Sequence, residues 1–137
     1  MIDQLTGSLN VYEQAIELRH ERQKMLTNNI ANADTPGYKA RDFDFASELQ
    51  KAVDQGSSGN QLALSQTSGR HIQRQVGGGV SVDVGYRVPA QPSLDGNTVE
   101  MDRERAAFSD NSVRYQAAVS MLDSRIQGLK SAMQPAR

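Results

Sequence analysis

Cysteine and tryptophan are absent from this 137-residue chain, and aromatic residues make up only 5% of it. Without cysteine the chain can form no disulfide framework and perform no thiolate chemistry. A hydrophobic fraction of 37% and a mean hydropathy of −0.60 leave little apolar material for an independent compact core. The length allows at most one ordinary domain.

Long apolar runs and an excess of one charge are also missing. The longest uninterrupted apolar runs are three residues, such as Leu62-Ala63-Leu64. We therefore expect no segment that spans a bilayer and no cleavable secretory signal. The net charge is −1, which provides no general attraction to nucleic acid or to an acidic membrane. The sequence predicts no nucleic-acid partner and no direct membrane insertion.

A heptad stripe of apolar residues runs along residues 1–33. Nine positions spaced alternately four and three residues apart are apolar in seven cases, with Arg19 and Gln23 as the polar exceptions. The pattern predicts a long helix that packs against other helices. The apolar members are Leu5, Leu9, Tyr12, Ile16, Leu26, Ile30 and Ala33, and Val11, Ala15, Leu18 and Met25 widen the stripe on one side.

A second stripe of the same period occupies residues 101–137. Arg105 and Ser112 are its polar members; Asp102 is the expected N-cap, and Pro135 is expected to end the helix. Two stripes of similar length predict a mainly α fold whose terminal helices pair as an antiparallel coiled coil. The apolar members are Met101, Phe108, Tyr115, Val119, Leu122, Ile126, Leu129 and Met133.

The composition changes between the two helices, over residues 34–100. Eight of the eleven glycines lie between Gly56 and Gly96. Residues 80–88, "VSVDVGYRV", alternate as a strand does, and "QLALS" at 61–65 predicts a shorter strand. We expect a small β or extended middle segment, part of which is mobile.

A firm stop follows the first helix at "DTPGYK". Thr35 precedes a proline and is pushed out of helical geometry, while Gly37 can adopt a positive φ. The predicted turn gives Tyr38, Phe43 and Phe45 fixed positions from which to pack on the helices. A turn of this kind also serves any helical hairpin, so its chemistry alone leaves the function open.

The longer run "NNIANADTPGYKA", at 28–40, resembles the N-terminal signature of the bacterial flagellar axial proteins, the rod and hook family. The resemblance continues in "ALSQTSGRHI", through Leu64, Thr67 and His71, and in residues 93–122. The short chain resembles the proximal rod members more than the longer distal-rod and hook proteins. Residues 50–78 and 89–92 contribute little to it beyond the Leu/Thr/His element.

The resemblance implies a structural subunit without enzymatic activity, stacked helically with other copies into a shaft that transmits torque. It implies contacts with the rod proteins FlgC and FlgF, with FliE, with the membrane ring protein FliF and with the flagellar export apparatus. The implied location is the basal body rod in the periplasmic space, reached without a cleavable signal peptide.

Three sets of residues are the candidate functional residues. Phe45 and Leu49 match the Phe-x-x-x-apolar spacing of an export-gate element that the resemblance implies, although the same spacing is ordinary on a helix. The assembly motif comprises Ala31, Asn32, Thr35, Pro36, Gly37, Tyr38 and Lys39, and the helix-packing set comprises Leu9, Tyr12, Ile16, Leu26, Ile30, Phe108, Tyr115, Val119, Leu122, Ile126 and Leu129.

Catalytic, cofactor and metal signatures are not found in the sequence. "HERQK" begins like a zinc-protease motif, but position 24 is lysine, and His20 and His71 are the only histidines. We expect no cofactor, no metal and no catalysis. Two alternatives remain open: another short flagellar rod protein, and a soluble coiled-coil adaptor outside the flagellum.

An acidic row on the first helix gives one further hypothesis. Glu13, Glu17 and Glu21 follow one another at intervals of four, which places like charges on one face. The row could face basic groups such as Arg114 and Arg125 on another helix or subunit. The simpler interpretation is a solvated face, because exposed ion pairs contribute little to stability.

Overall fold

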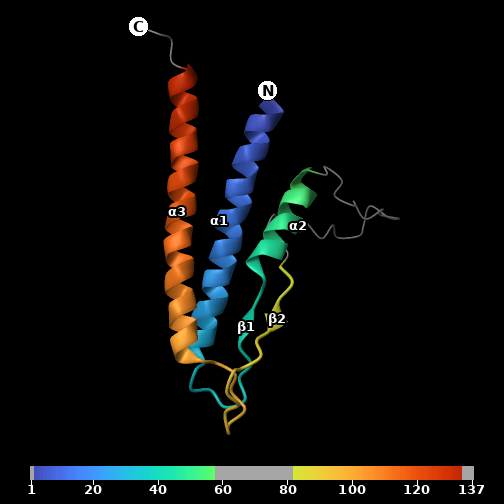
Figure 1. The fold of residues 1–137 in the computed structure, drawn as a ribbon, viewed down its shortest axis with the longest axis vertical. Coiled ribbons are helices and arrows are strands. Elements are labelled where there is room, and N and C mark those ends of the chain that lie inside the picture. Colours follow the sequence, from blue (N-terminus) through green and yellow to red (C-terminus); the bar gives the residue numbers. More distant parts are fainter. Residues whose placement is uncertain (1, 58–81, 134–137) are drawn as a thin grey trace, which may run out of the picture.

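The computed structural model describes residues 2–57 and 82–133, which form three helices and a short two-stranded ribbon. In Figure 1, α1 lies between α3 and α2, and α3 runs antiparallel to α1. The mainly helical fold predicted from the sequence is confirmed. In chain order the elements are α1 (Ile2–Ala31), β1 (Arg41–Asp42), α2 (Phe45–Ser57), β2 (Gly85–Tyr86) and α3 (Met101–Met133).

Helix α1 packs on two sides. On one side Leu18, at the widened edge of the stripe, is fully buried with Phe43 and Ala52, and Met25 packs against this cluster. On the stripe itself Leu26 is fully buried. The widened stripe is therefore explained by a second helix, α2, that the sequence analysis did not predict.

The helix α2 corrects the prediction that the middle segment is only β or extended. Asp44 caps it, since the Asp44 Oδ1 accepts a hydrogen bond from the backbone N–H of Ala46 at 3.1 Å. Phe45 and Leu49 lie one turn apart and pack against the cluster of Leu18, Phe43 and Ala52. The apolar face of this helix is what anchors the middle segment to α1.

The β ribbon is shorter than predicted. Of residues 82–88, the described part of the predicted strand, only Gly85 and Tyr86 form a strand, and they pair antiparallel with Asp42 and Arg41. Val82 packs against the cluster of Leu18, Phe43 and Ala52, but Val84 is 39%, Tyr86 69% and Val88 84% exposed. The predicted strand at 61–65, the Leu64/Thr67/His71 element and Pro135 lie outside the described residues.

The start of α3 shows that the predicted N-cap was wrong. The helix begins at Met101, so Glu100 occupies the cap position and Asp102 lies within the first turn. The Glu100 carbonyl accepts the first backbone hydrogen bond, from Glu104, at 2.9 Å. Its carboxylate instead accepts hydrogen bonds from the backbone N–H groups of Ala90 and Gln91, which ties the preceding connector to the helix.

Candidate assembly site

The turn after α1 has the conformation that its sequence predicts. The backbone N–H of Tyr38 donates to the Thr35 carbonyl at 3.2 Å, and Gly37 has a φ of +72°. Proline at the second position and a positive-φ glycine at the third are typical of a type II turn. Asn32 stabilises the approach to the turn, because its side-chain amide donates to the Asn28 carbonyl at 2.8 Å.

A second turn, at residues 93–96, is locked against the first. The Gly37 N–H donates to the Asp95 carbonyl at 2.9 Å, and the Lys39 Nζ donates to the Gly96 carbonyl at 2.6 Å. Gly96 also has a positive φ, +74°, and a Cβ added there would lie 3.9 Å from the Gly37 Cα. The two glycine turns therefore face each other closely.

Asn97 fastens this pair of turns to the end of α1. Its Nδ2 lies 3.1, 2.7 and 3.0 Å from the carbonyl oxygens of Asn32, Ala33 and Thr35. These carbonyls belong to the segment that follows α1, whose last residue is Ala31. A buried side chain from a distant part of the chain thus holds the segment between α1 and the first turn in place.

Asn29, in the last turns of α1, acts as a partner for β1. Its Oδ1 accepts the Arg41 N–H at 3.1 Å, and its Nδ2 donates to the Arg41 carbonyl at 2.8 Å. A neighbouring strand would bind the same two backbone groups. The amide therefore closes one edge of the ribbon, and the Tyr38 hydroxyl donates to the same Oδ1 at 3.3 Å.

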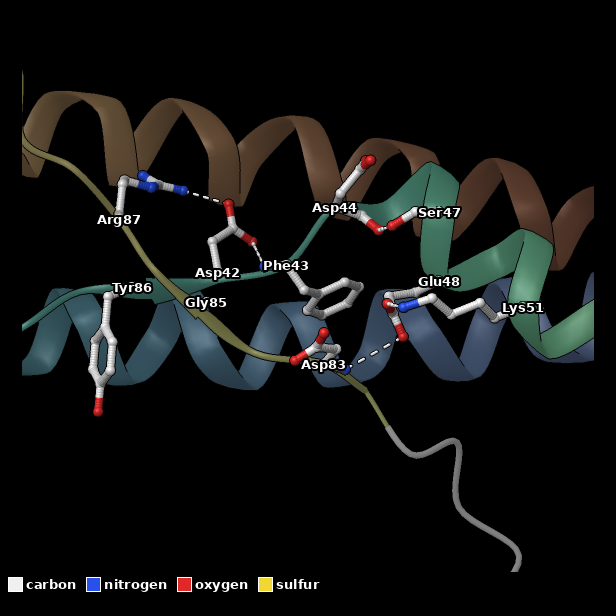
Figure 2. A pocket seen from close by; sticks show the side chains of 10 residues that line it. All are labelled: Asp42, Phe43, Asp44, Ser47, Glu48, Lys51, Asp83, Gly85, Tyr86 and Arg87. Carbon is white, nitrogen blue, oxygen red and sulfur yellow. Dashed lines mark hydrogen bonds and ion pairs between the residues drawn. The ribbon is translucent and has the colours of Figure 1, made fainter.

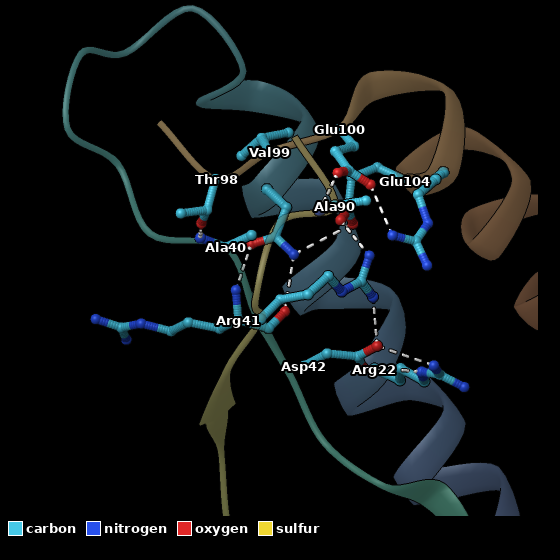
Figure 3. A network of polar contacts seen from close by, with 12 residues as sticks. Arg22, Ala40, Arg41, Asp42, Ala90, Thr98, Val99, Glu100 and Glu104 are labelled. Carbon is cyan, nitrogen blue, oxygen red and sulfur yellow. Dashed lines mark hydrogen bonds and ion pairs between the residues drawn. The ribbon is translucent and has the colours of Figure 1, made fainter. Parts of the chain in front are cut away.

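A charged network joins the ribbon to both long helices (Figure 3). Asp42 accepts two hydrogen bonds from Arg22, at 3.0 and 2.9 Å, and forms an ion pair with Arg87. Arg87 also pairs with Glu104, whose side chain is fully buried and which accepts a bond from Asn29 at 3.2 Å. Every buried polar side-chain atom among the described residues has a hydrogen-bond partner.

The electrostatics of Asp42 follow from this network. Burial acts to raise the pKa of Asp42, but the hydrogen bonds and charges of Arg22 and Arg87 outweigh burial and hold that pKa below its usual value. In turn, the hydrogen bond with Asp42 raises the pKa of Arg22. The pair is therefore ionised at neutral pH.

The polar positions in the two apolar stripes meet each other. Gln23 donates to the Ser112 hydroxyl at 2.9 Å, and Asn111 donates to the Gln23 Oε1 at 2.6 Å and to the Arg19 carbonyl at 2.9 Å. The Arg19 guanidinium also lies 4.0 Å from the centre of the Phe45 ring. A hydrogen-bonded layer of this kind specifies one register of α1 against α3.

The helix-packing residues are mostly not buried in the single chain. Of the set predicted from the sequence, Leu26 is buried and Tyr115, Val119 and Ile126 are 36%, 41% and 38% exposed. The other seven are half-buried: Leu9, Tyr12, Ile16, Ile30, Phe108, Leu122 and Leu129. The pair of helices alone therefore leaves much of its apolar stripe accessible.

One member of the acidic row, Glu21, has a basic partner in the same helix. Glu21 forms an exposed ion pair with Lys24 at 2.8 Å, and Arg114 pairs with Asp110 of α3 at 2.9 Å. These contacts favour the simpler interpretation, a solvated face. The reach of the row toward another subunit remains a hypothesis.

Sequence reasoning missed the residues that hold the motif in place. The assembly motif lies at the turn as expected, but Asn29, Asp42, Arg87, Asn97 and Glu104 were not identified. Asn97 carries a local signal, because "DGN" predicts a second tight turn. The charged residues Asp42, Arg87 and Glu104 carried no comparable local signal that they would pair with one another.

Two hollows lie along the ribbon. One, of about 390 Å³, is shown in Figure 2 between the start of α2 and β2, and the other, of about 500 Å³, lies beside the first turn. Tyr86 lines both. Within residues 2–57 and 82–133 no group of three metal-ligating side chains occurs, and no helix is long and apolar enough to cross a membrane.

Comparison with known proteins agrees with the motif. A family profile described as "Flagella basal body rod protein" matches residues 9–39. The chain is 50% identical over 135 residues to the flagellar basal body rod protein FlgB of Yersinia enterocolitica and to that of Salmonella typhimurium, with 98% of each chain covered. It is 46% identical to the FlgB of Cereibacter sphaeroides, covering 91% of this chain and 92% of that one.

Proposed function

Because this chain belongs to the FlgB family of flagellar basal body rod proteins, which are structural and not enzymatic, we propose that it is a proximal rod subunit. In this role many copies assemble helically. They join the membrane ring to the drive shaft and transmit torque through many parallel contacts.

The exposed apolar stripe of α3 is the observation that carries the proposal. Tyr115, Val119 and Ile126 repeat at heptad spacing and are each more than a third exposed, and among the described residues α3 contacts no helix or strand other than α1. Fully burying an exposed side chain of this size contributes about 1.5–3 kcal/mol, so burying the exposed part of each of these contributes about 0.5–1 kcal/mol to an association. We propose that α1 and α3 pair as an antiparallel coiled coil and that further helices complete its packing in the rod.

The interlocked turns fit the same role. Backbone and side-chain hydrogen bonds join the turn that follows α1 to the turn that precedes α3. These bonds fix the direction in which the ribbon leaves the helix pair. We propose that this rigid junction sets how the helical layer meets neighbouring subunits. The expected neighbours are FlgC, FlgF, FliE, the ring protein FliF and other copies of this chain, in the periplasmic part of the basal body.

Mass spectrometry of purified hook–basal bodies tests the location. The chain is expected at a few copies per particle, beside the ring and hook proteins. Its absence from particles that contain the other rod proteins would overturn the proposal.

Substitution on α3 tests the role of the stripe. Val119→Asp introduces a charge where we expect a neighbouring helix, so the variant should be lost from particles while the helix content of the free chain is unchanged. Gln116→Asp places the same charge on an exposed position of α3 outside the stripe and is the control. Equal incorporation of both variants would contradict packing through the stripe.

A further inference from the structure

Two hollows lined by opposite net charges lie along the ribbon. The hollow beside the first turn is lined by Lys39 and Arg41, with Gly37 and two tyrosines, and by no carboxylate. The hollow at the start of α2 is lined by four carboxylates, Asp42, Asp44, Glu48 and Asp83, against two cations, Lys51 and Arg87. The first hollow therefore has a formal charge of +2 and the second a formal charge of −2.

The two cations of the basic hollow are exposed and held in place. The Lys39 Nζ is tethered to the Gly96 carbonyl at 2.6 Å, and the Arg41 guanidinium lies 5.6 Å from the centre of the Tyr86 ring. Neither forms an ion pair within the described part of the chain. Asp95, whose carboxylate is attracted to Lys39, already accepts hydrogen bonds from Ser93 and from the Asn97 N–H.

The acidic hollow retains charge that its own cations do not satisfy (Figure 2). Arg87 is used by Asp42 and Glu104, and Lys51 is used by Glu48 at 2.6 Å. Asp44 and Asp83 are exposed, and among residues 2–57 and 82–133 no ion pair includes either of them. Asp83 and the Asp44 oxygen that does not cap α2 thus remain available in the acidic hollow, and Lys39 and Arg41 remain available in the basic hollow.

We propose that the basic hollow of one copy binds the acidic hollow of a second copy. Charge complementarity favours a second copy as the partner, because the acidic surface that matches Lys39 and Arg41 is present on the chain itself. With a net charge of only −1, two copies of the chain do not repel each other strongly. This inference rests on the proposed function and adds to it the surfaces through which copies meet.

The contact joins two different surfaces, so it is head-to-tail. Each added copy uses one hollow in the contact and leaves its other hollow unused, so the association continues instead of closing as a two-fold dimer does. Tyr86 lines both hollows, so the two hollows are neighbours on the ribbon. When the basic hollow of one copy meets the acidic hollow of the next, the two ribbons are therefore offset from each other. A subunit of a growing shaft requires an open contact of this kind.

Cross-linking tests the proximity, because the chain contains no cysteine. Arg41→Cys and Asp83→Cys are produced together in the source bacterium, and basal bodies are isolated under oxidising conditions. A disulfide needs Cα atoms within about 7 Å. We expect a cross-linked pair only when both variants are present, and none when Arg105→Cys replaces Asp83→Cys as the matched control.

The outcomes separate this inference from the proposed function. Particles that contain both variants without the cross-link overturn the inference and leave the rod assignment intact. A cross-link formed by Arg41→Cys alone shows like surfaces meeting and also overturns it. Particles that contain neither variant, nor the unmodified chain, remove the proposed function and the inference with it.

Charge exchange tests the electrostatic basis. Arg41→Glu and Asp83→Arg each place like charges in the contact, and each variant alone should be incorporated about fivefold less than the unmodified chain. Produced together, the two should recover incorporation, because one copy then offers the charge that the other has lost. Arg105→Glu should be incorporated normally. Normal incorporation of both single variants would refute the charge pairing.

Discussion

The side-chain amide nitrogen of Asn97 lies 2.7 Å from the carbonyl oxygen of Ala33 and joins the two turns that flank the middle segment. The same nitrogen reaches the carbonyls of Asn32 and Thr35. One buried amide therefore holds the segment that follows α1 against the segment that precedes α3.

Asn97→Ala should destabilise the chain by about 1–2 kcal/mol, because it removes the hydrogen bonds that the buried Asn97 amide donates to the segment after α1. Urea denaturation followed by circular dichroism measures this. Asn28→Ala is the control, since Asn28 is exposed, and we expect a change within about 0.5 kcal/mol there. Equal effects of the two substitutions would show that the hydrogen bonds of the Asn97 side chain do not stabilise the chain.

Gly37→Ala should cost about 1–2 kcal/mol, although a Cβ at Gly37 would meet no atom within 4 Å. The cost comes from the φ of +72°, which residues with a Cβ avoid. Gly37→Asn should cost less, because asparagine tolerates this region better. Thermal unfolding ranks the three chains, and an alanine variant as stable as the parent would exclude backbone strain.

Asp42→Asn should lower stability at pH 7 by about 2 kcal/mol, because Arg22 and Arg87 lose a charged partner. The folded pKa of Asp42 lies below its usual value, so its contribution is present above about pH 4 and is lost as the pH falls through the folded pKa.

The difference between Asp42→Asn and the parent chain should therefore shrink below about pH 4, which denaturation at several pH values will measure. Asp34→Asn, at an exposed position, is the control. A difference that stays constant down to pH 2 would show that ionisation of Asp42 does not contribute.

Phe45→Ala should reduce secretion of the chain if Phe45 and Leu49 form an export-gate element. Both residues pack in the core with Leu18, so reduced secretion alone could reflect lost folding. Leu18→Ala damages the same core, by about 2–4 kcal/mol, without touching the element. Measuring the amount of each variant inside and outside the cell separates loss of the export element from loss of folding. Unchanged secretion of Phe45→Ala would rule out the export-gate hypothesis.

Local patterns in the sequence predicted the long helices and the turn, because these depend on neighbours within one or two turns of chain. The partners of the turn could not be predicted in this way, since Asn97 and Ala33 are 64 residues apart. The helix α2 did have a local signal: Asp44 as a cap, followed by apolar residues at 45, 49, 52 and 53.

The register of the two long helices was also partly present in the sequence. Each stripe is interrupted by polar residues, and the structure places Gln23 opposite Ser112. Matching the interruptions would have predicted this pairing. The buried Glu104 could not be predicted, because its partner Arg87 reaches it from a different element.

The contacts of Asn97 also have a consequence for the order of folding. A chain synthesised from its N-terminus presents residues 32–35 long before Asn97, and closure of so long a loop is slow compared with helix formation. We therefore expect α1 to form early and the junction between the two turns to form late. A chain truncated before Asn97 should keep the helicity of α1 but lose the hydrogen bonds that hold the two turns together.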